Sequence, residues 1–436
     1  MSLVLCHYHL QPGGVTRIIQ SQVEALRKIG FPSRLKLICG YKPDSLRIPG
    51  LAESDIIVKE AFDYLSEGVS AETCFTLSEA LSSTLTGLLG REDILHMHNP
   101  NLGKNPVLTL VLYRLAKEGY RLFYHCHDFS EDRKRNYDFN RRVINGYFSE
   151  NLNRVLYPDS RSCLFGVLNS RDFERLREMG IDEKRIRYVP NPVSLQPVSE
   201  NHDTTEIRKR ICKSLGIPAG RIIFLYPVRV IKRKNIGEFI LLASLFNSKA
   251  SWLVTLAPHN PAEIREYVKW KEFAKSEKIP VLFDVGHEQD FLELISAADR
   301  VITTSTQEGF GMTFLEPWLL GKPVVGRNIP YVIGDFEAQG IVFDSLYDRL
   351  PVSVGEREID FATLGLSEQM AFIRKVNRHK SIQENFLKAA RIDEILFRDI
   401  PRKTIENNKR IISTKYSLLG YGKRLSAIYQ DLSRES

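Results

Sequence analysis

The sequence predicts an α/β protein built from two Rossmann-like domains. The chain has 436 residues, which is more than one ordinary hydrophobic core accommodates. Two segments, residues 3–39 and 301–325, show the same order of strand, glycine-rich turn, helix and strand, and such units build parallel sheets covered by helices. The expected domains are residues 1–195 and residues 196–412, followed by a terminal segment, residues 413–436.

Composition and charge narrow the class of protein. The hydrophobic fraction of 43% and the charged fraction of 26% are typical of a soluble globular protein. The net charge of +8 favours anionic partners, whether a nucleotide, a phosphorylated substrate or a membrane surface. The six cysteines are scattered without a C-x-x-C pair, so we expect reduced thiols and a cytoplasmic protein. No apolar run reaches the roughly 20 residues of a membrane span, and the N-terminus does not resemble a signal peptide.

The first domain is expected to open with a buried strand at residues 3–10. A turn that ends in Gly14 follows, and a helix begins at Thr16 and stops at Gly30. Residues 35–39 form the second strand. The dinucleotide fingerprint G-x-G-x-x-G is absent at this turn, which counts against a dehydrogenase. Without further information Gly14 is equally well explained as a tight-turn residue.

The middle of the first domain carries a candidate catalytic histidine. A strand at residues 120–127 ends in His127 and Asp128, at the carboxyl end where sheets of this kind place active residues. His125 is the rival, because it lies two residues earlier on the same face of the strand. The other elements expected in this half are helices at residues 76–89, 106–117 and 172–179, and strands at residues 93–98, 166–169 and 186–190.

A basic run at residues 132–142 follows the histidine strand. The usual explanation of such a run is the solvated face of a helix. A second interpretation stays open, because Arg133, Lys134 and Arg135 could bind an anionic acceptor through phosphate or carboxylate groups.

The second domain is expected to follow a linker at residues 195–205, which is polar and contains a proline. A helix at residues 207–215 precedes a strongly apolar strand at residues 222–227. This strand delivers Arg229 and Lys234 at its carboxyl end. Two cations five residues apart can reach one diphosphate, where they would stabilise developing negative charge.

The segment at residues 301–325 carries the strongest functional signal. Its strand leads into a turn with Glu308, Gly309 and Gly311, and a helix is expected over residues 312–320. Unpaired N–H groups at a helix start favour a diphosphate, whereas carboxylates would repel phosphate and suit sugar hydroxyls. A nucleotide-sugar combines these groups. The plain alternative is an ordinary glycine turn with two solvated glutamates.

The remaining elements of the second domain carry little chemistry. The chain after residue 350 is expected to be mostly helical up to residue 412. The other expected elements are strands at residues 252–256, 281–285 and 323–325, and helices at residues 263–277, 290–298 and 416–432.

Glu308 and Glu316, with seven residues between them in EGFGMTFLEPWLLGKPVV, resemble the E-x7-E motif of retaining GT-B glycosyltransferases of group 1, family 4. This family includes sucrose-phosphate synthases and bacterial mannosyl- and glucosyltransferases. The resemblance covers almost the whole chain and is strongest in residues 222–326. It fails after Val325, where GRNIPYVIGDF replaces the usual GGIPE stretch, and PNPV replaces the commoner PNGV near residue 190.

The resemblance implies a fold and a set of site residues. The two domains would face each other across a cleft, and the C-terminal helix would cross back to the N-domain. Glu316 would hold the ribose, Glu308 a hydroxyl of the donor sugar, and the amides near Met312 the diphosphate. The implied catalytic residues are His127, Arg229, Lys234 and Glu308; the donor-binding residues are Gly14, Arg229, Lys234, Glu308, Gly309, Phe310, Gly311, Met312, Thr313 and Glu316; and the acceptor-binding residues are Arg17, Arg133, Lys134 and Arg135.

The function expected from this resemblance is transfer of a hexose from a UDP-, GDP- or ADP-linked sugar to an acceptor hydroxyl, with retained configuration. The acceptor could be an anionic small molecule or a glycan or lipid precursor. The chain contains no D-x-D motif, so no metal and no other cofactor are expected. Two alternatives stay open: another GT-B enzyme, such as an epimerase or a phosphorylase, and a non-enzymatic basic binder of nucleic acid or membrane. No nucleic-acid partner is expected, and peripheral membrane contact stays open.

Overall fold

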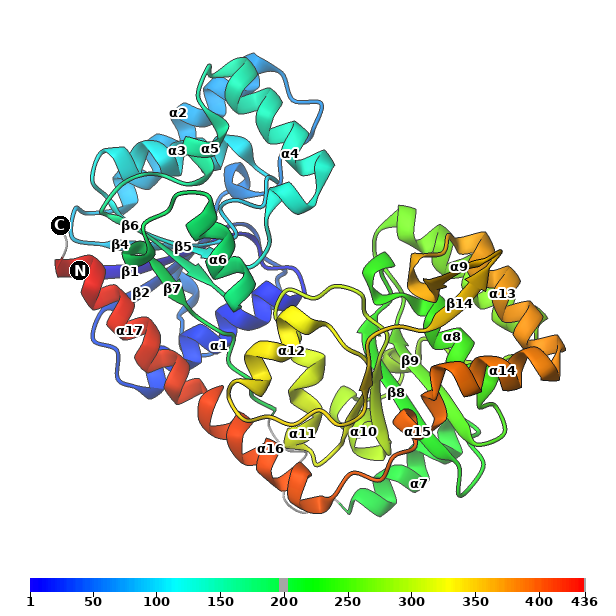
Figure 1. Cartoon of the computed structure of the whole chain (residues 1–436). Coiled ribbons are helices and arrows are strands. Elements are labelled where there is room, and N and C mark those ends of the chain that lie inside the picture. Colours follow the sequence, from blue (N-terminus) through cyan, green and yellow to red (C-terminus); the bar gives the residue numbers. More distant parts are fainter. Residues whose placement is uncertain (196–202, 435–436) are drawn as a thin grey trace. The chain divides into compact units, whose positions relative to one another are not determined.

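The protein consists of two compact units, each with a parallel sheet between helices (Figure 1). A computed structural model describes residues 1–195 and 203–434. The first unit comprises Met1–Pro192 together with the chain from Tyr416, and the second comprises Val193–Lys415. Most of the expected linker, namely residues 196–202, lies outside the described residues.

The first unit holds a seven-stranded sheet in the order β3-β2-β1-β4-β5-β6-β7, in which all neighbours are parallel. The strand order reverses between β1 and β4, which is where such sheets open a crevice at their carboxyl ends. The strands are β1 Ser2–His9, β2 Arg34–Tyr41, β3 Ile56–Val58, β4 Ile94–His98, β5 Arg121–Cys126, β6 Cys163–Val167 and β7 Ile186–Tyr188.

Several helices of this unit begin at a side chain that caps their first turn. Asn105 and Asn169 each accept a hydrogen bond from the backbone N–H group three residues further on, as Ser70 does for α2. The cap at Ser70 explains why α2 begins earlier than the apolar pattern predicts. The helices are α1 Gly14–Lys28, α2 Ala71–Leu88, α3 Pro106–Lys117, α4 Lys134–Arg141, α5 Leu152–Leu156, α6 Ser170–Glu178 and α17 Leu418–Arg434, and a π-helical turn, Arg142–Tyr147, follows α4.

The terminal helix α17 lies against α1 (Figure 1). Its apolar face joins the same buried cluster as Ile19 and Leu26 of α1. Gly422 permits the close approach of the two helices, because an added Cβ there would lie 2.6 Å from the carbonyl oxygen of Ala25. Tyr429 of α17 is also buried.

The second unit holds a six-stranded parallel sheet in the order β10-β9-β8-β11-β12-β13. Its strand order reverses between β8 and β11, so a second crevice is expected at their carboxyl ends. The strands are β8 Ile222–Arg229, β9 Ala250–Leu256, β10 Val281–Leu282, β11 Arg300–Thr303, β12 Val324–Arg327 and β13 Leu346–Tyr347. The main helices are α7 Thr204–Ser214, α8 Ile236–Leu245, α9 Pro261–Ser276, α10 Phe291–Ala297, α12 Pro330–Glu337, α13 Leu366–Arg378, α14 Lys380–Ala390, α15 Ile392–Leu396 and α16 Arg402–Lys415.

Three sequence predictions in this unit are wrong in part. The expected helix over residues 312–320 is a 3₁₀ turn, Met312–Phe314, followed by a short α11, Glu316–Leu319. Pro317 has no N–H to bond the carbonyl four residues earlier, so a continuous helix cannot form. The strand expected at 281–285 ends at Leu282, because Asp284 has left-handed backbone with φ of 63°.

The third correction concerns the region after residue 350. It opens with an antiparallel hairpin, β14 Pro351–Val354 and β15 Arg357–Asp360, before the predicted helices begin. Among the residues described, no helix combines the length and apolarity that a bilayer crossing requires.

Gly422→Ala should destabilise the first unit by about 1–3 kcal/mol, because the added methyl group overpacks the contact with α1. Urea unfolding followed by circular dichroism measures this change. Gly87→Ala is the matched control, since Gly87 lies in α2 with no atom within 4 Å of an added Cβ. That control should stabilise α2 by roughly 0.5–1 kcal/mol. Equal effects at the two glycines would contradict the packing of α17 on α1.

Candidate functional site

The site of the second unit is built where the chain leaves β8 and β11. Arg229 is the last residue of β8, and Lys234 ends the 3₁₀ turn that follows it. The two exits are tied together by hydrogen bonds to backbone carbonyls: Thr306 N–H donates to Arg233 at 2.9 Å, and Thr304 Oγ1 donates to Lys234 at 3.0 Å. This backbone pairing brings the cationic turn after β8 against the turn after β11.

Glu308 is held at the centre of this arrangement. Its carboxylate is buried and accepts from Lys234 Nζ on one oxygen and from Arg233 Nη1 on the other, the latter at 3.1 Å. The hydroxyl of Tyr331 accepts from the Glu308 N–H at 3.0 Å and donates to the Glu308 carbonyl at 2.8 Å. Side chain and backbone of Glu308 are therefore both fixed.

The charges of this cluster depend on each other. Burial alone raises the pKa of Glu308, but Lys234 and Arg233 outweigh it, so the pKa lies below its ordinary value. Burial lowers the pKa of Lys234, and Glu308 opposes that effect. An ammonium group has three donors, and the bond to Glu308 uses one of them. Lys234 can thus hold Glu308 and bind a further anion at once.

The turn beside Glu308 depends on one glycine. Gly311 has φ of 89°, and an added Cβ would lie 2.6 Å from Val332 Cγ1, so a larger residue does not fit. The preceding Phe310 ring packs edge-on against Phe336, with centroids 5.5 Å apart. The first hydrogen bond of the next turn is donated by Phe314 N–H, which leaves the N–H groups of the two preceding residues outside it. Those residues are Met312 and Thr313.

Glu316 and Arg229 complete the predicted set in this unit. Glu316 is the first residue of α11 and is buried. Arg229 is half-buried, and its Nη1 donates to the carbonyl of Ala257 at 2.9 Å. Partial desolvation lowers the pKa of Arg229, yet an arginine remains protonated at neutral pH.

Arg327 stands where the sequence departs from the pattern of its relatives, and the structure gives it a structural role. Its guanidinium is buried between Glu238 and Asp360, with bonds of 2.9 Å from Nε to Glu238 Oε1 and 2.7 Å from Nη1 to Asp360 Oδ2. Tyr347 also donates to Glu238 at 2.7 Å. The arginine thus joins α8 to the β14–β15 hairpin.

The candidate site of the first unit lies at the ends of β4 and β5. His127 follows β5 and is buried, and its backbone N–H donates to Asn99 Oδ1 at 2.7 Å. Its ring Nε2 lies 2.9 Å from Nδ1 of His98 at the end of β4. The rival His125 is fully buried, with Nδ1 3.2 Å from Nε2 of His96.

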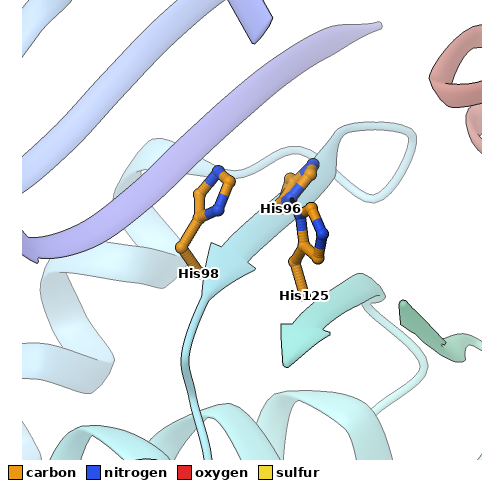
Figure 2. A group of neighbouring side chains, drawn as sticks. All are labelled: His96, His98 and His125. Carbon is orange, nitrogen blue, oxygen red and sulfur yellow. Dashed lines mark hydrogen bonds between the residues drawn. The ribbon is translucent and has the colours of Figure 1, made fainter. Parts of the chain in front are cut away.

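Three of these histidines form a group that could accept a metal ion. The candidate ligand nitrogens of His96, His98 and His125 lie within 4.8 Å of one another (Figure 2). Burial lowers the pKa of all three rings, so they are neutral at pH 7, the form that binds metals. Figure 2 shows His96 and His98 on one strand and His125 on its neighbour.

The predicted acceptor-binding cations are exposed, and three of them already have carboxylate partners. Arg133 pairs with Asp128 at 2.8 Å, and Lys134 pairs with Asp138 at 2.6 Å. Arg135 pairs with Glu67 at 2.5 Å, and it lines a cavity of about 540 Å³ with Lys134, Phe139 and Arg142. Gly14 and Arg17 lie in α1, and both are exposed.

Comparisons with known proteins decide the family. Residues 207–346 match the model for glycosyl transferases group 1. Over 391 residues the chain is 30% identical to the mannosylglucosyl-3-phosphoglycerate synthase of Petrotoga mobilis, and the alignment covers 85% of this chain and 72% of that relative. The chain belongs to the group 1 glycosyltransferases. It is therefore an enzyme, as the sequence predicts.

Solved structures confirm the GT-B fold of this glycosyltransferase. The sucrose-phosphate synthase of Thermosynechococcus elongatus superposes with a TM-score of 0.62 over 100% of both chains at 13% identity. Anabaena HepE, in complex with UDP and glucose, superposes with a TM-score of 0.61 over 99% of each chain at 15% identity. Two Rossmann-like domains, as expected from the sequence, are thus the fold of the glycosyltransferase.

The structure gathers part of the predicted site and adds residues that sequence reasoning missed. In the glycosyltransferase, Lys234 and Glu308 are in direct contact, and the glycine turn follows Glu308. Arg233 lies between the two predicted cations and carries no functional signal of its own in the sequence, yet it binds Glu308. Tyr331 lies in the stretch GRNIPYVIGDF, where the sequence departs from the family pattern, and it fixes the Glu308 backbone. Neither contact can be predicted from the residues that neighbour Arg233 or Tyr331 in the sequence.

Glu308→Gln should destabilise the glycosyltransferase by about 3 kcal/mol at pH 7, because it leaves Lys234 buried without its counterion. The folded pKa of Glu308 is lowered, so its stabilising contribution is present above about pH 4.3 and is lost as the pH falls through the folded pKa. The difference in the free energy of unfolding between the variant and the wild type, measured with urea, should therefore become smaller at acidic pH.

The matched control for this measurement is Glu384→Gln. Glu384 pairs with Lys380 at 3.8 Å on the exposed face of α14, so its loss should change stability by less than about 0.5 kcal/mol. If Glu308→Gln lowers the free energy of unfolding no more than the control does, the buried pair does not stabilise the unit.

Proposed function

We propose that this enzyme transfers a hexose from a nucleotide-sugar to an acceptor hydroxyl, with retained anomeric configuration and without a metal ion. The observation that carries the proposal is the buried contact between Lys234 and Glu308 at the strand reversal of the second unit. This contact places the Lys234 ammonium group, which can bind phosphate, beside the Glu308 carboxylate, which can accept hydrogen bonds from sugar hydroxyls. A nucleotide-sugar carries both partners next to each other.

The donor diphosphate would be bound by cations and backbone amides of the second unit. Lys234 keeps two N–H donors for phosphate while the third holds Glu308. Arg229 and the amides of Met312 and Thr313 would share the negative charge that develops on the leaving diphosphate. These groups supply the positive charge that a metal ion provides in other transferases, which supports the proposed independence from metals and other cofactors.

Glu308 would position the donor sugar rather than attack it. Both carboxylate oxygens are engaged by cations, and the lowered pKa of the group weakens it as a nucleophile. Its fixed oxygens suit the role of accepting a hydrogen bond from a sugar hydroxyl. Glu316 would accept the ribose hydroxyls in the same way. His127 of the first unit would contact the donor sugar.

Retention of configuration would follow if the acceptor approaches from the face that the diphosphate leaves. The leaving phosphate oxygen, held by Lys234 and Arg229, would take the proton of the acceptor hydroxyl. This mechanism needs no carboxylate pair flanking the bond, unlike that of glycosidases. The E-x7-E spacing of Glu308 and Glu316 supports it through the resemblance to retaining enzymes.

The acceptor is proposed to be anionic. The name of the Petrotoga mobilis relative refers to a sugar conjugate of 3-phosphoglycerate, a compound with a phosphate and a carboxylate. In this chain Arg133, Lys134 and Arg135 would exchange their carboxylate partners for such an acceptor, and Arg17 would assist. Location in the cytoplasm remains the expectation from the cysteine pattern.

A thermal-shift screen with UDP, GDP, ADP and their common sugar conjugates tests the donor class. A ligand that binds only the folded protein raises its melting temperature, by mass action. One nucleotide should give a clear shift, and addition of a chelator should not change it. A shift that vanishes with chelator would contradict the metal-independent mechanism, and no shift with any nucleotide would count against a nucleotide-sugar donor.

Glu316→Ala should weaken binding of that nucleotide-sugar by roughly 1.5–3 kcal/mol, the value of hydrogen bonds to a charged group. Isothermal calorimetry measures the change, and a melting curve of the variant checks that it is folded. Glu337→Ala, an exposed change at the end of α12, is the control and should leave affinity unchanged. Unchanged affinity in a folded Glu316→Ala protein would refute the ribose role.

A further inference from the structure

A network of neutral polar side chains fills the interior of the first unit behind His127, and the proposed chemistry does not use it. His98 Nδ1 lies 2.9 Å from His127 Nε2, and His98 Nε2 lies 2.8 Å from Gln22 Oε1. Gln22 Nε2 lies 2.9 Å from His96 Nδ1 and 2.8 Å from the hydroxyl of Tyr429. All these side chains are buried. Gln22 of α1 thus joins β4, through its two histidines, to the terminal helix.

The geometry favours a hydrogen-bonded network over a metal site at these histidines. The rings of His96 and His98 are stacked, with centroids 4.4 Å apart and planes inclined by 23° (Figure 2). Lone pairs of imidazole lie in the ring plane, so those of two near-parallel rings do not converge on one ion about 2.0–2.1 Å from each nitrogen. The nitrogens are instead spaced 2.6–3.2 Å from neighbouring donors or acceptors.

The Gln22 amide gives the network a direction. Its nitrogen, which can only donate, lies 2.9 Å from His96 Nδ1 and 2.8 Å from the hydroxyl of Tyr429. His96 Nδ1 therefore carries a lone pair, and the proton of this neutral ring is on Nε2. His96 Nε2–H donates to His125 Nδ1 at 3.2 Å.

The oxygen end of the Gln22 amide extends the same direction to His98. It lies 2.8 Å from His98 Nε2, which therefore carries a proton and donates to it. At the other end, the Tyr429 hydroxyl also lies 2.6 Å from the accepting His96 Nδ1. His98 Nδ1 is left with a lone pair and accepts from His127 Nε2–H. Each ring is neutral with one proton, on Nε2.

We propose that Gln22 fixes these proton positions, so that His127 is held as the Nε2–H tautomer with a lone pair on Nδ1. Gln22 is then a positioning residue that acts through His98 and determines that His127 accepts a hydrogen bond from substrate. This role in catalysis rests on the proposed function, in which His127 contacts the donor sugar. If the Gln22 amide were turned by 180°, each histidine of the network would carry its proton on Nδ1 instead of Nε2. The two arrangements therefore predict different tautomers.

Long-range ¹⁵N–¹H correlation spectra of the full chain, labelled with ring-¹⁵N histidine, test the proposal directly. The chain has 10 histidines, and the variants His98→Asn and His127→Asn assign the two signals. Both rings should show the Nε2–H pattern. His7 is the internal reference, because its Nδ1 faces the carbonyl oxygen of His98 at 3.3 Å and must carry the proton there. An Nδ1–H pattern for His127, or averaged tautomers in the wild type, would overturn the proposal.

Two glutamines of α1, Gln20 and Gln22, provide a test variant and a matched control for the effect on activity. Gln22→Met keeps the size of the side chain but removes both hydrogen-bonding ends, so His98 and His127 should show averaged tautomers. If the proposed function holds, kcat should fall by about tenfold while KM for the donor changes less than about twofold. Gln20→Met is the control, since Gln20 lies on the same helix and donates to the carbonyl of Arg47 at 3.2 Å, outside the histidine network. It should change neither spectrum nor kcat.

The outcomes separate this inference from the proposed function. Unchanged tautomers in Gln22→Met, or stoichiometric zinc or nickel bound to the wild type by elemental analysis, would overturn the role of Gln22. Should Gln22→Met fail to fold, the wild-type spectrum alone still decides the direction of the network. Full activity of His127→Asn would instead refute the catalytic role of His127, whatever its tautomer.

Discussion

The second unit depends on one buried ion pair, between Lys234 and Glu308. A carboxylate that is removed from water needs a cation and further donors, and here Lys234 and Arg233 occupy its two oxygens. This requirement fixes the turn after β8 against the turn after β11. Tyr331 completes the constraint through the Glu308 backbone. The Glu308 carboxylate, which could bind a sugar hydroxyl, is thereby held in a fixed position beside the Lys234 ammonium group.

A second group of buried charges, Arg327 with Glu238 and Asp360, stabilises the fold and leaves no group for a ligand in the arrangement described. Its three groups satisfy one another across α8, β12 and the β14–β15 hairpin. Gly326 next to it allows close strand packing, since an added Cβ would lie 2.0 Å from the carbonyl oxygen of Thr303. The Lys234–Glu308 pair thus positions groups of the candidate site, and the Arg327 group supports the sheet beside it.

The polar interior around His127 in the first unit is built from uncharged side chains. Its buried histidines are neutral because burial lowers their pKa values. Neutral rings must match donors to acceptors, and Gln22 offers one of each between His96 and His98. Arg133 and Arg135 of this unit instead lie at the surface beside carboxylates.

The sequence by itself determined the two strand, glycine-turn, helix units, the E-x7-E pair and the cations after the apolar strand, because these follow from short-range patterns. Pro317 breaks the helix expected after Gly311, which is a local effect that the apolar pattern concealed. Only the tertiary structure decided which polar groups meet. Arg233 and Glu308 are 75 residues apart, and Gln22 and Tyr429 are 407 apart. Such contacts arise from strand order and helix docking, and nothing in the neighbouring residues encodes them.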